Sequence, residues 1–326
     1  MTIEQPSADW RDYELIDSGD FAKLERWGPY VTIRPEPKAL WAKSLSDAEW
    51  RHLAHTEFKP GAGFGKAGKE DSGTWTMLHK MQEQWTISYP AGGFKLRLGL
   101  TSFKHVGVFP EQAPNWDFIG ESVRQIIAAE GGSRGEGPGN DRSSAPKVLN
   151  LFAYTGAASL AARRAGAEVT HLDAVRQVVT WARGNMELSG MDGIRWIIED
   201  ALKFARREAR RGNRYQGIIL DPPAYGHGPD GEKWKLDELL FDLLKNVAQI
   251  LAPRDSFMVL NLYSNGYSAM LGETTVREAF GLRPEPGFTA APGHDGAYLA
   301  LESGELALRD SFGKVLPLSI FVRLKR

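Results

Sequence analysis

The sequence contains no cysteine among its 326 residues. Without a thiol, the chain can form no disulfide, no thiolate metal site and no cysteine nucleophile. A chain without cysteine is compatible with a reducing compartment. Residues 1–6 also lack the basic and apolar regions of a secretory signal peptide. We therefore expect a cytoplasmic protein.

Long apolar runs and an excess of one charge are missing as well. No uninterrupted apolar stretch is long enough to cross a bilayer, so we expect no membrane partner. The net charge is only −1, so no global field would draw the chain to nucleic acid. The sequence predicts no metal site, and its length predicts two domains with a sizeable core.

The composition changes along the chain and predicts three regions. Residues 1–120 hold seven of the ten tryptophans and several short strand-like segments bounded by Gly and Pro, which predicts a β-rich domain for substrate recognition. Residues 121–146 combine most of a helix with a flexible Gly-, Ser- and Pro-rich loop. Residues 147–326 alternate strands and helices, which predicts a mostly parallel sheet.

Local signals define elements within the first region. Ser46 followed by Glu49 is a capping-box pattern and predicts a helix over 46–58. A Gly-rich turn at 91–93 predicts a hairpin. The tryptophans of this region could stack on bases, or they could form the core of a small sheet, which is the interpretation we favour.

The last region reads as a doubly wound α/β fold, whose ligands bind at the carboxyl ends of the strands. The predicted strands are 148–152, 168–173, 194–199, 217–221 and 256–263, followed by 305–308 and 318–324. The predicted helices are 157–165, 176–189, 201–211 and 236–251, with a short one at 274–280. Together they predict a Rossmann-like sheet of seven strands.

A cofactor cradle is predicted where the first of these strands turns into its helix. A strand, a glycine turn at Gly156 and a helix N-terminus present free N–H groups to a ligand. The turn lacks both the G-x-G-x-x-G dinucleotide fingerprint and the Gly-Lys-Ser/Thr ending of a P-loop. A turn with one glycine better suits a cofactor that carries a carboxylate and an amine and no phosphate, such as S-adenosyl-L-methionine.

Asp173 is the next acidic residue after a predicted strand. It follows Gly156 by 17 residues, close to the interval of about 20 at which a carboxylate meets ribose hydroxyls in a βαβ unit. Two carboxylate oxygens can accept from two vicinal hydroxyls. The alternative is an ordinary strand that happens to end in Asp.

The motif Asp-Pro-Pro-Ala-Tyr at 221–225 follows another buried strand. It resembles the motif of class I S-adenosylmethionine methyltransferases that act on base nitrogens. With Asn-Leu-Phe-Ala-Tyr-Thr-Gly at 150–156 and Trp-Ala-Arg-Gly-Asn at 181–185, the chain resembles the bacterial large-subunit ribosomal RNA base methyltransferases. That family modifies cytosine C5 or guanine N7, so the resemblance implies a ribosomal RNA partner.

The resemblance also implies residues that hold the cofactor. Asp200 would accept a hydrogen bond from the adenine amino group, although it could instead only cap the helix that follows. Gln112 is a candidate neighbour of the cofactor, but the family usually has Arg residues after this Gln, and here Ala113-Pro114 follow. The complete implied set is Phe152, Tyr154, Thr155, Gly156, Asp173, Asp200 and Gln112.

The predicted catalytic residues are Asp221, Pro222, Pro223 and Tyr225. Asp221 and the carbonyl of Pro222 would accept hydrogen bonds from an amine, the prolines would stiffen the loop, and Tyr225 would stack on a flipped base or merely pack. Methylation at C5 needs a covalent nucleophile. Relatives that perform it carry Cys after the fifth strand, where this chain has Tyr263 or Ser264, so we expect nitrogen methylation.

Several alternatives stay open on the sequence alone. The same fold could methylate a protein side chain or a small molecule, or the chain could be a non-catalytic RNA-binding module that retains the cofactor pocket. Six basic residues within 203–214 could grip RNA phosphates or form a solvated helix face. The glycine-rich segment 61–69 could close over phosphates or be a simple surface loop.

Overall fold

The computed structural model describes residues 2–63, 71–132, 145–263, 266–282, 291–292 and 298–326. The chain divides into two compact units. The α/β unit consists of Met1–Thr2, Asn115–Glu305 and Ser319–Arg326, and the β-rich unit of Ile3–Pro114 and Leu306–Leu318. The predicted loops at 61–69, 131–146 and 287–296 lie largely outside the described residues.

The main sheet confirms the predicted α/β class. Its strands run in the order β1-β17-β18-β15-β12-β9-β10-β11, and β16 pairs with β17. Strands β15, β12, β9, β10 and β11 are mutually parallel, and β18 is antiparallel to β15. All seven predicted strands are present, and β1 and β16 extend the sheet. The bounds are β1 Thr2–Glu4, β9 Lys147–Leu151, β10 Glu168–Asp173, β11 Arg195–Ile198, β12 Gly217–Leu220, β15 Phe257–Leu262, β16 Ala291–Pro292, β17 Tyr298–Arg309 and β18 Val315–Lys325.

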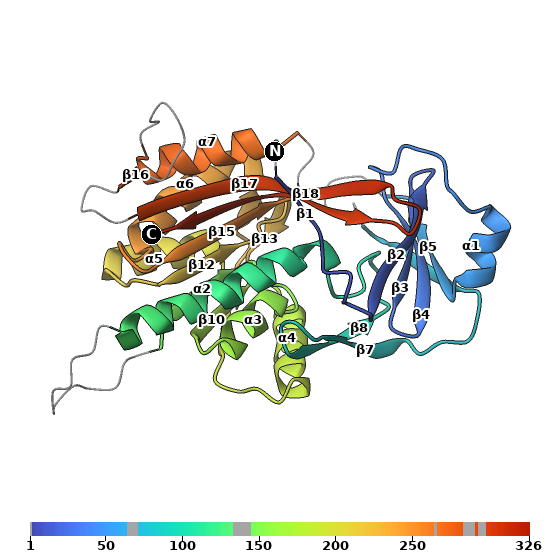
Figure 1. Cartoon of the computed structure of the whole chain (residues 1–326), viewed down its shortest axis with the longest axis horizontal. Helices are drawn as coiled ribbons and strands as arrows, with labels where there is room; N and C mark the ends of the chain where they lie inside the picture. Colours follow the sequence, from blue (N-terminus) through green and yellow to red (C-terminus); the bar gives the residue numbers. More distant parts are fainter. Residues whose placement is uncertain (1, 64–70, 133–144, 264–265, 283–290, 293–297) are drawn as a thin grey trace. The chain divides into compact units, whose positions relative to one another are not determined.

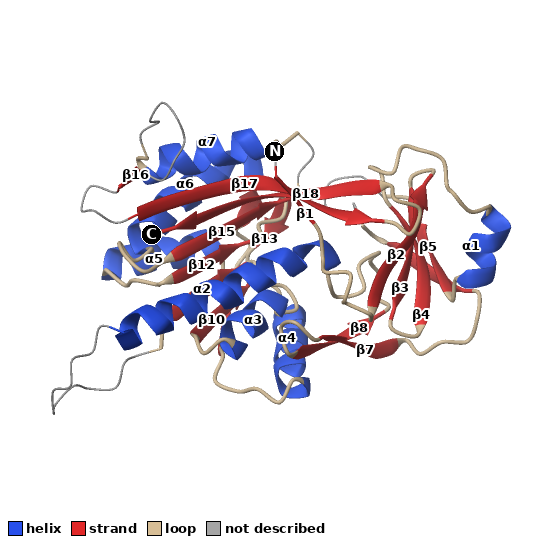
Figure 2. Cartoon of the chain, in the orientation of Figure 1, coloured by secondary structure: helices blue, strands red, loops and turns tan. Residues whose placement is uncertain are grey.

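Helices cover both faces of this sheet, which is why its central strands are buried along most of their length. Every residue of β12 and β15 is buried. Figures 1 and 2 show α2 and α3 on the near face and α6 and α7 on the far face. The bounds are α2 Ala113–Gly132, α3 Ala157–Arg164, α4 Arg176–Leu188, α5 Ala201–Arg211, α6 Leu236–Ile250 and α7 Ala269–Phe280.

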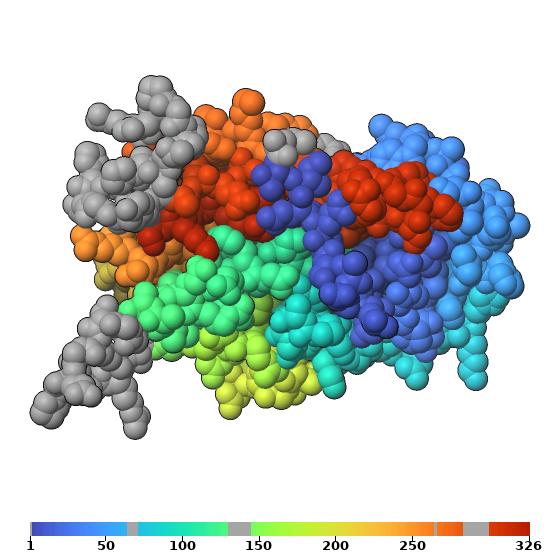
Figure 3. Space-filling view, viewed as in Figure 1, coloured from blue at the N-terminus to red at the C-terminus, as the bar shows by residue number. Residues whose placement is uncertain are grey.

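Helix α2 shows the amphipathic pattern that this packing requires. Its apolar residues Ile119 and Val123 are fully buried, whereas Glu121 and Arg124 are exposed. Figure 3 shows the outer side of α2, in green, at the surface of the molecule.

Among the described residues, no helix is long and apolar enough to cross a membrane.

The order in which strands are added to the sheet reverses between β9 and β12, which makes this the topological switch point of the sheet. From β9 the chain builds outward through β10 and β11, then returns to the other side of β9 to form β12 and β15. In open α/β sheets, ligands bind at the carboxyl ends of the strands at this point. Leu151 ends β9 opposite Leu220 of β12, so residues 152–156 and 221–223 leave the sheet side by side.

The β-rich unit contains a five-stranded sheet in the order β2-β3-β4-β5-β6 and the separate hairpin β7-β8. The hairpin turns at the predicted position. The bounds are β2 Tyr13–Gly19, β3 Ala22–Trp27, β4 Tyr30–Pro35, α1 Asp47–Leu53, β5 Thr56–Pro60, β6 Gly73–Met77, β7 Gln84–Tyr89 and β8 Phe94–Gly99.

The predicted helix over 46–58 is correct at its start and wrong at its end. Ser46 caps α1, and the reciprocal bonds of the capping box with Glu49 are present. The helix stops at Leu53 because Ala54 adopts an extended conformation. The chain then enters β5, which pairs with β4 and β6, so sheet pairing overrides the local helical pattern.

The aromatic residues of the first 120 positions mainly form core. Of the seven tryptophans, Trp41 and Trp75 are half-buried and the other five are buried. The structure thus supports the interpretation that these tryptophans form the core of a small sheet, rather than a surface on which nucleic-acid bases stack. The buried five are Trp10, Trp27, Trp50, Trp85 and Trp116.

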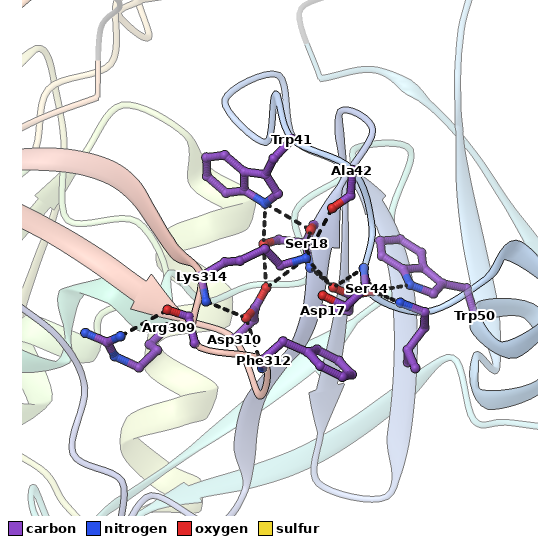
Figure 4. Close-up of polar contacts among 12 residues, drawn as sticks. Asp17, Ser18, Trp41, Ala42, Ser44, Trp50, Arg309, Asp310, Phe312 and Lys314 are labelled. Atoms are coloured by element: carbon purple, nitrogen blue, oxygen red, sulfur yellow. Dashed lines mark hydrogen bonds and ion pairs between the residues drawn. The ribbon is translucent and has the colours of Figure 1, made fainter.

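A buried carboxylate organises one end of the β-rich unit (Figure 4). Asp17 accepts hydrogen bonds from the indole of Trp50 at 2.8 Å and from Lys314 Nζ at 2.7 Å. Backbone N–H groups of Ser44 and Leu45 also donate to it. Lys314 comes from the segment Leu306–Leu318, so these bonds fix that distant segment to the unit. The sequence did not predict this association.

Candidate functional site

The loop after β9, residues 152–156, has an unusual backbone. Phe152, Tyr154 and Gly156 have φ values of 56°, 48° and 91°. Left-handed backbone is uncommon for residues other than glycine, and bulky aromatic residues adopt it only where their surroundings enforce it. Such conformations cluster at ligand sites. Because the sequence analysis predicts that residues 152–156 contact the cofactor, we refer to them as the cofactor loop.

Neighbouring elements hold the cofactor loop through its main chain. The N–H of Ala153 donates to the carbonyl of Leu172 at 3.1 Å. The side-chain amide of Asn185, buried on α4, donates to the carbonyl of Thr155 at 2.9 Å. The conformation therefore depends on β10 and α4 as well as on the loop sequence. The sequence analysis quoted Asn185 as part of the motif at 181–185 but gave it no role.

Gly156 is required for both conformation and space. Its φ of 91° is unfavourable for any residue with a side chain. A Cβ atom at this position would also lie 3.0 Å from the Cβ of Ala182 on α4. The glycine therefore lets the N-terminus of α3 approach α4 closely, which gives the predicted turn glycine a physical reason.

A buried polar network supports the start of α3. Asn150 donates to the hydroxyl of Ser159 at 2.9 Å, and that hydroxyl lies 3.0 Å from Nδ1 of His171. Burial lowers the pKa of His171 to about 3, so the imidazole is neutral at physiological pH. These three side chains come from β9, α3 and β10, and they tie the elements beneath the cofactor loop together.

Asp173 ends β10 next to the cofactor loop, as predicted. Its Oδ2 accepts from the N–H of Tyr154 and its Oδ1 from the N–H of Val175, both at 2.9 Å. Burial raises the pKa of the carboxyl, and these backbone hydrogen bonds only partly offset the effect. Additional hydroxyl donors would stabilise its charged form, so the environment fits ribose recognition.

Asp200 follows β11, and its side chain caps α5. Its Oδ1 accepts from the N–H of Lys203 at 2.8 Å, so the capping role is present. A carboxylate has two oxygens, and capping is therefore compatible with the contact predicted to adenine. The side chain is half-buried at the same sheet edge as Asp173.

Asp221 leaves β12 at the switch point, and its backbone N–H faces the carbonyl of Leu151 at 3.4 Å. The buried amide of Asn261 on β15 donates to Asp221 Oδ1 at 2.8 Å. Ser319 on β18 in turn donates to Asn261 Oδ1 at 2.9 Å. This chain of bonds fixes the amide so that its NH₂ group faces the carboxylate. The sequence analysis did not identify Asn261 or Ser319.

The prolines after Asp221 lead into a two-stranded ribbon that the sequence analysis missed. Its strands are β13 Tyr225–His227 and β14 Lys233–Lys235. Tyr225 is half-buried, and its hydroxyl lies 3.1 Å from Nε2 of His227. The Pro-Asp-Gly sequence at 229–231 is a turn signal that could have revealed the hairpin.

Other predicted residues lie elsewhere or remain untested. Gln112 is buried in a short 3₁₀ helix, Pro110–Gln112, of the β-rich unit, and its contact with the cofactor stays a prediction. Tyr263 follows β15 directly, as the sequence analysis expected. Ser264 lies outside the described residues.

The basic residues of α5 largely pair within the chain. Lys203 contacts Asp230 and Glu232, each at 3.1 Å. Arg206 pairs with Asp242, Arg207 with Glu199, and Arg211 with Glu208. This pairing favours the interpretation of α5 as a solvated helix face over a dedicated phosphate-binding face.

Within the described part of the chain, no group of three His, Cys, Asp or Glu side chains could hold a metal ion.

Comparisons with known proteins give a consistent result. The sequence model of the S-adenosylmethionine-dependent methyltransferase family matches residues 135–288. The crystal structure of an S-adenosylmethionine-dependent methyltransferase from Agrobacterium tumefaciens is 36% identical and superposes with a TM-score of 0.82. That match covers 100% of this chain and 93% of the other.

Curated relatives with assigned substrates match only in part. Ribosomal RNA large subunit methyltransferase K/L of Shewanella frigidimarina is 27% identical over 173 residues, which is 52% of this chain and 21% of that protein. Ribosomal RNA large subunit methyltransferase I of Aeromonas salmonicida is 37% identical over 86 residues, or 26% of this chain and 22% of that protein. The chain thus spans about a fifth of the length of these relatives.

Proposed function

The chain belongs to the S-adenosylmethionine-dependent methyltransferases, and from this premise we propose that it methylates a nitrogen of an RNA base. The observation that carries the proposal is the position of Asp221-Pro222-Pro223, which leaves the sheet beside the cofactor loop at the switch point. The acceptor would be ribosomal RNA in the cytoplasm. The names of the partial relatives support this substrate.

The residues of the α/β unit fit the cofactor. Asp173 would accept from the ribose hydroxyls and Asp200 from the adenine amino group, and the N–H groups of the first turn of α3 would face the carboxylate of the cofactor. When bound, the cofactor supplies an electrophilic methyl group on a sulfonium. The raised pKa of Asp173 supports this role, because a carboxylate without a cationic partner among the described residues gains most from added donors.

The acceptor nitrogen would be positioned by the loop after β12. Asp221 Oδ2 and the carbonyl of Pro222 would accept from an amine, which directs its lone pair toward the methyl group. Asn261 keeps Asp221 in one orientation through Oδ1. Since methyl transfer is an in-line displacement, this orientation is the main contribution that the protein makes to the rate.

The absence of cysteine supports nitrogen over C5 of cytosine. Attack at C5 requires a covalent adduct with a strong nucleophile, and the chain has no thiol. A base nitrogen already carries a lone pair and needs positioning instead. Guanine N7 is one such atom, and the amino groups of adenine, cytosine and guanine are others.

The class of acceptor can be tested with methyl-labelled cofactor. The protein is incubated with undermodified ribosomal RNA in the presence of unrelated cellular protein and small metabolites, and portions are then digested with ribonuclease or protease. Label that only ribonuclease releases supports the proposal. Label that only protease releases, or that is confined to small molecules, contradicts it. Omitting the RNA provides the control.

A further inference from the structure

Trp234 lies at the point where the acceptor loop, residues 221–224, meets the ribbon formed by β13 and β14. Its indole Nε1–H donates to the carbonyl of Pro223 at 2.7 Å. Its ring lies 4.8 Å from the ring of Phe152, centroid to centroid, in a tilted arrangement. One side chain, 2% exposed, thus contacts both the acceptor loop and the cofactor loop.

From these contacts we infer that Trp234 is a positioning residue, which sets the acceptor loop relative to the cofactor loop during methyl transfer. The inference rests on the proposed function of the Asp-Pro-Pro motif. No single sequence motif contains Phe152, Pro223 and Trp234, so only the fold brings them together.

The sequence around Trp234 explains why the indole points inward. In β14 the flanking Lys233 and Lys235 are exposed and Trp234 is buried, which is the alternation expected for a strand with one covered face. Gly226 lies opposite Trp234 in the ribbon.

Hydrogen bonds to the consecutive carbonyls of Pro223 and Ala224 fasten the acceptor loop to Trp234 and to the residue two positions after it. The N–H of Leu236 donates to the carbonyl of Ala224 at 3.0 Å, and the indole holds the preceding carbonyl. Proline has no N–H, so the acceptor loop offers few other backbone donors for fastening. With the carbonyl of Pro223 occupied by the indole, the carbonyl of Pro222 is the one assigned to the acceptor.

A second attachment of the ribbon, formed by ion pairs, is weaker than the hydrogen bond of the indole. At its tip, Asp230 and Glu232 pair with Lys203, whose side chain is 53% exposed. Solvent-exposed ion pairs contribute little to stability because water and salt screen them. Of these two attachments the buried indole is therefore the stronger, and loss of its N–H is expected to loosen residues 221–225 more than loss of the ion pairs.

The central test compares Trp234→Phe with the wild-type protein. Phenylalanine keeps an aromatic ring against Phe152 but removes the bond to Pro223. We expect kcat to fall by about tenfold to a hundredfold, because a small misplacement of reacting groups has an effect of this size. The dissociation constant of the cofactor should stay within about twofold, since the cofactor loop keeps its packing. Trp234→Leu, which loses both contacts, should also weaken cofactor binding.

A matched control is available in the β-rich unit. Trp10 is 3% exposed and donates to the carbonyl of Ser88 at 2.7 Å, so Trp10→Phe removes an equivalent bond of a buried indole within the other unit. This variant should lose comparable stability and keep kcat. If both variants lower kcat equally, the effect is one of general stability and the inference is wrong.

Hydrogen exchange provides a readout that does not depend on the acceptor. In Trp234→Phe, the amides of Ala224 to His227 should exchange faster than in the wild type, and those of the cofactor loop should not change. Unchanged exchange at Ala224 to His227 would overturn the positioning role. If wild-type protein transfers no label to RNA but exchange responds as expected, the proposed acceptor is wrong and the role of Trp234 stands.

Discussion

Asp17 in the β-rich unit and Asp173 in the α/β unit show two uses of one side chain. Burial raises the pKa of both carboxyl groups, but at Asp17 the hydrogen bonds from Leu45, Lys314, Trp50 and Ser44 outweigh burial and lower it. At Asp173 the main-chain N–H groups do not outweigh burial, and the pKa stays raised. The difference lies in the cation and the indole that only Asp17 receives.

The comparison separates a carboxylate that holds the fold from one that fits a ligand. Asp17 is paired with a cation and is already stabilised in its charged form. Asp173 would gain stabilisation from further donors, such as two ribose hydroxyls. Perturbed pKa values occur in both settings, so the direction of the shift and the identity of the partners are more informative than the size of the shift.

The largest expected effect is on the folding of the β-rich unit. Asp17→Ala leaves Lys314 and the indole of Trp50 without their acceptor, and we expect the free energy of unfolding to fall by about 3–5 kcal/mol. Chemical denaturation measures it. Asp9→Ala removes an exposed carboxylate of the same unit and should change stability by less than about 0.5 kcal/mol. Equal effects of the two variants would contradict a structural role for Asp17.

A large effect on catalysis is expected at Asp221. Asp221→Ala removes the proposed hydrogen-bond acceptor of the substrate amine and should lower kcat by about 10²–10³-fold, the usual loss for one preorganised electrostatic group. Cofactor binding, measured by calorimetry, should be nearly unchanged because Asp221 belongs to the acceptor loop. Turnover close to the wild-type rate would remove the role assigned to this residue.

An intermediate effect is expected from the buried imidazole of His171. Its pKa is about 3 in the folded protein and 6.5 in the unfolded chain, so the unfolded state binds a proton first as the pH falls. Stability from this group is complete above pH 6.5 and is lost between pH 6.5 and 3. Between pH 7 and 4.5 the loss amounts to about 2–3 kcal/mol.

His171→Gln tests this pH dependence. Glutamine can still bond to Ser159 but does not titrate, so the variant should lose less stability than the wild type between pH 7 and 4.5. Thermal or chemical unfolding at the two pH values measures the difference. Parallel curves for the two proteins would show that His171 does not carry the acid sensitivity.

The smallest effect is expected at Asp173. Asp173→Asn removes the charge and one acceptor oxygen, and we expect the cofactor to bind about tenfold more weakly, as for the loss of one hydrogen bond to a charged group. Stability should change far less than in Asp17→Ala, because relief of charge burial offsets the lost backbone bond. If Asp173→Asn lost as much stability as Asp17→Ala and kept its cofactor affinity, Asp173 would be a structural carboxylate like Asp17, and the distinction drawn between the two residues would be wrong.

The sequence predicted the fold and the strand-end positions because both depend on local periodicity. Alternating apolar strands and helices predict a parallel sheet, and Asp173, Asp200 and Asp221 follow its strands as expected. The class of cofactor also followed from the lone Gly156 and the missing phosphate-binding glycines.

Other features depend on contacts between distant segments and could not be predicted from local patterns. Asn261 reaches Asp221, and Ser319 reaches Asn261, only because β15 lies between β12 and β18. Lys314 reaches Asp17 across almost the whole length of the chain. The helix over 46–58 was predicted too long because Thr56 pairs with distant strands, which its own neighbours in the sequence do not reveal.

The most direct test of the central claim is to identify the methylated atom. The protein is incubated with methyl-labelled S-adenosylmethionine and undermodified ribosomal RNA, and the RNA is digested to nucleosides for mass spectrometry. The account predicts label on a base nitrogen, lost in Asp221→Ala. Labelled 5-methylcytidine would contradict it, because a chain without cysteine would then have methylated a ring carbon.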